Sequence, residues 1–116
     1  MNESILFTIK TMLDVPTDQD SFDLELKAHI NSALFTLYQI GVGPSVPFVL
    51  ETGEETWADF ISDVNKIASV KQYVFISVKL LFDTASTGSS TISALERERD
   101  RLEWRLNVEA DPSEEI

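Results

Sequence analysis

The sequence has no cysteine, a single histidine, and only four glycines and four prolines among its 116 residues. The absence of cysteine excludes disulfides, thiolate metal sites and thiol nucleophiles, and it fits a reducing compartment. The single imidazole, His29, has only Glu25 one helical turn before it. That pair supplies neither a cluster of transition-metal ligands nor a base beside an activated nucleophile. We therefore predict no metal, no cofactor and no catalytic residue.

Long apolar runs are also absent. No stretch approaches the roughly 18 residues that a membrane-spanning helix needs. No basic segment followed by an apolar one opens the sequence, so we expect no secretory signal. The expected protein is therefore made in the cytosol and has no contact with a membrane.

Positive charge is scarce: nine lysines and arginines face 20 acidic residues, which gives a formal net charge of -11 at pH 7. Such a protein does not grip nucleic acid by neutralising phosphates. All four arginines lie within residues 97–105, where acidic residues balance them, and residues 109–115 carry four acids and no base. Solvated charge of this kind keeps a protein soluble, and it disfavours duplex DNA as a ligand.

Apolar residues make up 43% of the chain, which is enough for one core in one domain. Apolar spacing predicts a short helix over residues 5–13 that ends before Pro16. A second helix is predicted from Asp20 to Gly41, with Asp20 and Asp23 as capping carboxylates. The core stripe expected for this second helix comprises Phe22, Leu26, Ile30, Ala33, Leu37 and Ile40.

The middle of the chain differs in composition from the two predicted helices before it. Residues 41–47 combine two glycines with two prolines and predict a long loop, followed by a short extended segment near 48–50 as an open alternative. Thr56 is the expected N-cap of a short helix that runs to Val64. Residues 67–82 are apolar almost all round and are longer than most buried strands, so they predict the central helix of a bundle.

The end of the chain predicts a flexible loop at 83–91, with Ser90 or Thr91 as a cap, and then a last helix over 92–107. The expected organisation is one helical domain over residues 1–107 and a flexible acidic tail over 108–116. The fold class is thus all-α, a small bundle of about four to five helices. The core side of the last helix is expected to carry Ile92, Leu95, Leu102 and Leu106.

A second side of the last helix is rich in arginine and tryptophan, the residues most enriched at binding hot spots. We predict a protein interface there, made by Arg97, Arg101, Trp104, Arg105 and Val108. The alternative is a salt-bridged solvent face whose tryptophan packs inward. A helix that has both a core side and a second side suited to binding favours packing against two neighbours and not against one.

The order of these segments resembles the phage head-tail connector family, small helical adaptors that join the portal vertex to the tail. One departure is Asp83-Thr84-Ala85, where the family pattern has prolines after the aspartate. The segments that carry the resemblance cover most of the chain: Ile30 to Leu34 running to Gly41 to Pro44, Glu55 to Phe60, Val70 to Val74 through Val78 to Asp83, and Leu102 to Asn107.

The resemblance implies a structural virion protein and not an enzyme. It implies subunits, made in the host bacterial cytoplasm, that assemble as a ring at the head-tail interface of the virion. The implied partners are further copies of the chain, the portal protein, and a tail-side adaptor or tail completion protein. DNA would pass through the ring without specific binding, which suits an acidic subunit.

The composition leaves one alternative function open. An acidic helical module can also act as a regulatory or anti-host protein that occupies a nucleic-acid-binding protein as a DNA mimic. The two functions predict different sizes, because a connector forms rings alone or with portal, whereas a mimic stays small and competes with DNA.

Overall fold

The structure, a computed structural model, describes residues 4–82 and 88–110. Within these residues the only strand-type pairing is an isolated antiparallel bridge between Ser4 and Thr56. The prediction of an all-α bundle of about four to five helices is confirmed. The helices described are α1 (Ile5–Met12), α2 (Asp23–Gln39), α3 (Trp57–Phe60), α4 (Val64–Lys79) and α5 (Ser89–Ala110).

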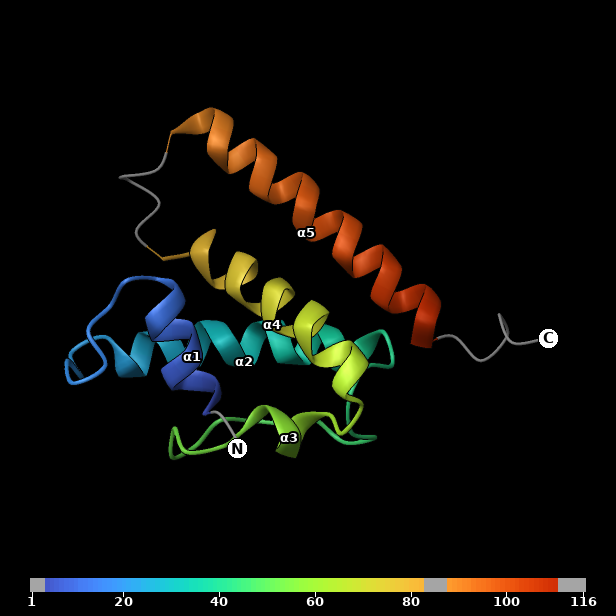
Figure 1. The fold of residues 1–116 in the computed structure, drawn as a ribbon, viewed down its shortest axis with the longest axis horizontal. Helices are drawn as coiled ribbons and strands as arrows, with labels where there is room; N and C mark the ends of the chain where they lie inside the picture. Colours follow the sequence, from blue (N-terminus) through green and yellow to red (C-terminus); the bar gives the residue numbers. More distant parts are fainter. Residues whose placement is uncertain (1–3, 83–87, 111–116) are drawn as a thin grey trace.

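Helix α4 is the centre of the bundle, as predicted for the apolar run over 67–82 (Figure 1). It packs against α2 and α5, and it also contacts α1. One α4 stripe, Val70, Val74 and Val78, is completely buried because it meets these neighbours. Helix α2 contributes a matching buried stripe of Leu26, Ile30, Ala33, Leu34 and Leu37.

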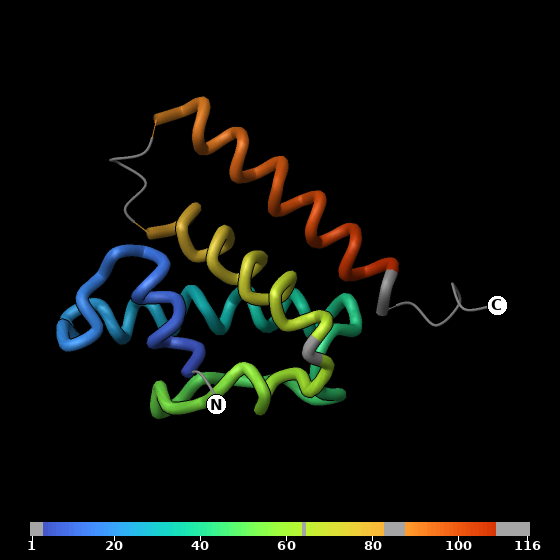
Figure 2. Tube along the Cα trace, viewed as in Figure 1, coloured from blue at the N-terminus to red at the C-terminus, as the bar shows by residue number. Residues whose placement is uncertain are grey.

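Helix α5 lies at the edge of the bundle, and its main contact is with α4 (Figures 1 and 2). It buries Leu102 and Leu106 against the core. A polar contact accompanies this packing, because the Tyr73 hydroxyl of α4 donates to Glu103 Oε1 at 2.8 Å. Burial and the bond to Glu103 raise the pKa of Tyr73 well above its usual value, so the hydroxyl remains a donor. The opposite side of α5 is left to solvent.

The start of α2 differs from the prediction. The helix begins at Asp23, and its N-cap is Phe22, whose side chain makes no capping bond. Asp20 is therefore not the cap, and the Asp23 carboxylate accepts a bond from Lys10 Nζ at 2.8 Å. Phe22 precedes the helix and is 37% exposed, so its place in the predicted core stripe was wrong.

The boundary between α3 and α4 also differs. Thr56 caps α3 as predicted, in a reciprocal capping box with Asp59, but the helix ends after one turn, at Phe60. Helix α4 begins at Val64 and not at residue 67, because the Asp63 carboxylate accepts a bond from the Asn65 amide at 2.9 Å and caps it. The predicted single helix from 57 to 64 is thus two separate elements.

Residues 48–50 form no strand. The Leu50 amide donates to Asn31 Oδ1 at 2.7 Å, and Asn31 Nδ2 donates to the Leu50 carbonyl at 3.2 Å. The Asn31 side chain thus makes the two backbone hydrogen bonds that a neighbouring strand would otherwise make. The open alternative of a short extended strand was wrong because the partner for this backbone is a side chain.

Helix α5 is longer than predicted at both ends. It begins at Ser89, so Ser90 and Thr91 lie inside the helix and are not its cap. It continues to Ala110, so residues 108–110 of the predicted tail are helical. The remainder of the tail, 111–116, and residues 83–87, which include the departure from the family pattern, lie outside the described residues.

Lys10 is buried to 4% exposure on α1, although its neighbours in sequence gave no sign of this. Its ammonium donates to Asp23, to the Thr17 carbonyl at 3.3 Å and to the Gln19 carbonyl at 2.6 Å. A buried ammonium without such acceptors would be very costly. The three bonds tie the segment between α1 and α2 to the bundle.

The turn before α3 is organised by Glu55. Its carboxylate accepts backbone bonds from the amides of Glu51 at 2.9 Å, Thr52 at 3.2 Å and Gly53 at 3.0 Å. Burial alone would raise the pKa of Glu55, but the backbone bonds outweigh it and lower the pKa to about 2. The same turn holds the start of α1, because the Ile5 amide donates to the Glu55 carbonyl at 2.9 Å.

We expect Glu55→Gln to lower the free energy of unfolding at pH 7 by about 1 kcal/mol, a value discounted for solvent screening of this partly exposed group. The folded pKa lies below the ordinary value of 4.5, so the stabilisation is present above that value and is lost as pH falls towards about 2. Urea unfolding at a series of pH values should show the difference between wild type and variant shrinking below pH 5. Glu54→Gln is the control, and an equal pH dependence there would contradict the assignment.

Candidate functional site

The residues predicted as an interface lie together on the outer side of α5. At 3.6 residues per turn they fall within a sector of about 100°, roughly opposite the buried Leu102 and Leu106. Trp104 is 66% exposed, so the inward packing that the alternative of a salt-bridged solvent face gave to this tryptophan is wrong. The arginines are exposed and Val108 is half-buried. We call this surface the α5 face, made by Arg97, Arg101, Trp104, Arg105 and Val108.

The charges of the α5 face are only partly satisfied. The Arg101 guanidinium makes a two-pronged pair with Glu98, at 3.1 and 2.5 Å. The bond to Arg101 lowers the pKa of Glu98, and the bond to Glu98 raises the pKa of Arg101. Arg97 and Arg105 make no ion pair with another described side chain. These two arginines, beside an exposed indole, are available to acids of another molecule.

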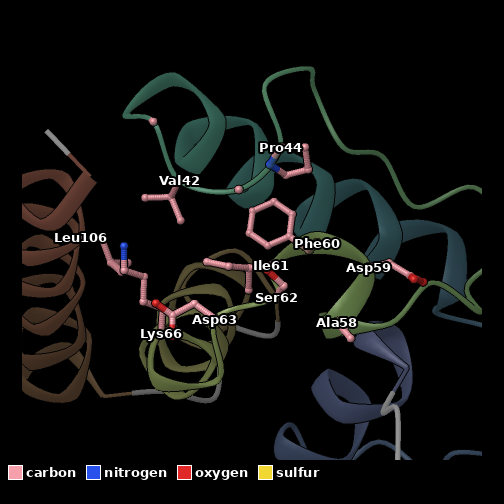
Figure 3. A pocket seen from close by; sticks show the side chains of 12 residues that line it. Val42, Pro44, Ala58, Asp59, Phe60, Ile61, Ser62, Asp63, Lys66 and Leu106 are labelled. Carbon is pink, nitrogen blue, oxygen red and sulfur yellow. The ribbon is translucent and has the colours of Figure 1, made fainter. Parts of the chain in front are cut away.

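A hollow of about 530 Å³ lies between residues 41–44, the α3–α4 connection and Leu106 (Figure 3). Gly43 has a φ of +95°, and a Cβ there would come within 2.6 Å of the Phe60 ring. Glycine is therefore required at this turn, both for the backbone and for the close approach of the ring. The ring of Phe60 forms part of the floor of the hollow.

The carboxylates at this hollow hold helix ends. Asp59 accepts the Thr56 amide at 3.0 Å, and Asp63 accepts the Asn65 amide at 2.9 Å. Figure 3 shows Asp59 pointing away from Asp63 and Lys66, so the two acids do not converge on one point. Among the residues that the structure describes, no three His, Asp or Glu side chains gather as a metal site. The chemistry of the hollow is thus that of helix capping.

The sequence matches the family model described as phage connector protein over residues 5–113. The chain belongs to the phage connector protein family. The match extends through all five helices, and it confirms the resemblance to head-tail connectors. Comparison with curated proteins and comparison with solved structures find no match.

Membership of the phage connector family establishes the general role of this protein. The family is one of structural proteins, so this connector is a component of the phage particle that contacts other virion proteins. In the part of the chain covered by the structure, no helix is both long and apolar enough to cross a membrane.

The connector has a second surface that the sequence did not predict. A cleft of about 440 Å³ opens where the segment after α1 meets the end of α4. The rings of Phe22 and Phe82 meet there edge to face, with centroids 5.3 Å apart. Both phenylalanines were expected inside helices, and nothing local to either signals their contact. We call this surface the loop cleft, lined by Leu13, Asp14, Val15, Pro16, Phe22, Glu25 and Phe82.

Proposed function

We propose that this connector protein assembles as a ring between portal and tail, and that DNA passes through the ring. The observation that carries the proposal is the α5 face, where an exposed Trp104 lies among arginines on a helix that is covered on its opposite side only. Exposed tryptophan and arginine together are characteristic of the centre of protein interfaces. Membership of the connector family supports the same role.

The proposed partners are further copies of the chain, the portal protein, and a tail-side adaptor or tail completion protein. Residues Arg97, Arg101, Trp104, Arg105 and Val108 form the proposed interface. Arg97 and Arg105 suit it best, because neither makes an ion pair with another described side chain, although the charge of Arg105 acts on Glu98, and because the chain as a whole carries a net charge of -11. Acidic surface is therefore abundant on any second copy.

The proposed passage of DNA is supported by the same charge. A ring whose subunits each carry a net charge of -11 repels the phosphates of DNA and does not form the contacts that would retain it. Release of DNA through such a ring needs no specific base or phosphate recognition. The proposed place of the assembled protein is the head-tail interface of the virion.

Negative-stain electron microscopy of the purified protein mixed with its portal protein tests this function. Closed rings seated on the portal are the expected result. A protein that stays a single chain beside portal, and that displaces DNA from a nucleic-acid-binding protein, would instead support the regulatory alternative and overturn the proposal.

A further inference from the structure

We infer that the α5 face of one copy binds the loop cleft of the next copy, with Trp104 as the anchor. The inference rests on the proposed function, because it specifies how the copies of a ring contact one another. The described residues leave both surfaces incompletely covered, and the two surfaces are complementary in polarity and charge.

The loop cleft is an apolar binding site that suits an aromatic ring. Its volume of about 440 Å³ has walls formed by Leu13, Val15, Phe22 and Phe82. Phe22 is 37% exposed, although its ring packs edge to face on Phe82. A large apolar side chain that enters the cleft removes this surface from water.

Hydrogen bonds within the chain hold the side of the cleft that the segment after α1 forms. The Val15 amide donates to the Lys10 carbonyl at 2.9 Å, and Asp14 has a left-handed φ of 63° that reverses the chain there. The buried ammonium of Lys10 fixes the far end of the same segment through Asp23. Because this segment is already ordered, binding avoids the entropic cost of ordering it.

The charges at the cleft match those of the α5 face. Asp14 lies at the cleft and makes no ion pair with another described side chain, and Glu25 lies 3.5 Å from His29 Nε2. Across the contact, Arg97 and Arg105 lie on the same side of α5 as Trp104, and neither makes an ion pair with another described side chain. An indole with two arginines is thus matched by an apolar cleft with two carboxylates.

No described residue of α5 lines the loop cleft within one chain. The segment after α1 and the C-terminal half of α5 lie towards opposite ends of the molecule, whose longest extent is 47 Å (Figures 1 and 2). Contact between them therefore joins different copies head to tail. Such a contact repeats in one direction and closes into a ring when the rotation per copy permits. The larger hollow beside Phe60 suits the arginines and Trp104 of another copy less well, because its carboxylates, Asp59 and Asp63, already accept hydrogen bonds that cap helices.

Because the chain has no cysteine, single cysteines allow a direct test of this contact. Asn107→Cys places a thiol beside the α5 face, Thr17→Cys places one beside the cleft, and Gln39→Cys serves as a control at the opposite end of α2. All three positions are exposed. Two single-cysteine proteins are mixed with portal protein and treated with a short bismaleimide.

The expected result is a cross-linked heterodimer from the Asn107→Cys and Thr17→Cys pair, in clear excess over the Asn107→Cys and Gln39→Cys pair. Adding Trp104→Ala to the Asn107→Cys protein should lower the yield about 30-fold, as for a hot-spot residue. Arg105→Glu should lower it about tenfold, and Glu25→Arg in the partner should restore most of that loss.

Equal yields from the two pairs would overturn the inference, as would a yield unaffected by Trp104→Ala. The result is separable from the test of the proposed function. Rings on portal without the specific cross-link would leave the connector role intact and remove this contact. A specific cross-link without rings on portal would do the reverse, because it would keep the contact and remove the proposed role.

Discussion

We expect the Arg101→Glu/Arg105→Glu double variant to keep its helical circular dichroism and to lose assembly. Both side chains are exposed on the α5 face, and a surface change of this kind alters stability by only about 0.5 kcal/mol per site. The loss of assembly has an electrostatic cause. Reversal turns the basic side of an already acidic chain into an acidic one, and placing like charges across an interface costs several kcal/mol.

The expected weakening of association is about 100-fold or more, which corresponds to roughly 3 kcal/mol. Sedimentation velocity and negative-stain images with portal protein provide the measurement. Lys27→Glu/Lys79→Glu is the matched control, because it changes the net charge equally on α2 and α4 and leaves the α5 face intact. Normal rings from the arginine variant, or equal loss from the lysine variant, would remove the α5 face as an interface.

The largest expected effect on stability comes from Trp57→Ala. Trp57 is only 2% exposed at the start of α3, and its indole Nε1 donates to Thr8 Oγ1 of α1 at 3.1 Å. The indole therefore joins two elements that lie far apart in the sequence. Truncation leaves a cavity and removes the hydrogen bond that the Thr8 hydroxyl accepts, so the free energy of unfolding should fall by about 3–5 kcal/mol.

Urea unfolding followed by circular dichroism measures this loss. Domains of this size are stabilised by only about 5–15 kcal/mol, so Trp57→Phe is a useful second variant that keeps most of the ring and loses the hydrogen bond, at about 1–2 kcal/mol. The other tryptophan supplies the matched control. Trp104→Ala should change stability by less than about 0.5 kcal/mol because the side chain is exposed. Equal losses from the two alanine variants would contradict the described burial.

The positions and faces of the helices followed from the sequence because helical periodicity is a local property. Residues three and four apart share a side of a helix whatever surrounds them, so Leu102 and Leu106 were assigned to the core and Trp104 to another side. The cap at Thr56 was equally local, because it depends on a residue three positions later. The family resemblance drew on the same ordered segments.

Helix boundaries were less accurate because nearby polar groups compete for the same backbone amides. Asp63 caps α4, and this divides an apolar pattern that continues on both sides of it. Asp20 and Asp23 were predicted together as the capping carboxylates of α2, but Lys10 binds Asp23 from another helix, and the N-cap is Phe22. Neither acid caps the helix, and the role of Asp23 depends on a lysine of α1 that the local sequence does not reveal.

The sequence by itself determined that this connector is an acidic, cysteine-free helical protein whose last helix has a core side and a side of arginine and tryptophan. Only the tertiary structure decided that Lys10 is buried, that Asn31 holds Leu50, and that Phe22 and Phe82 form a cleft. Periodicity and capping depend on residues within one or two turns. These contacts join residues separated by loops, and their partners are set by how the helices pack.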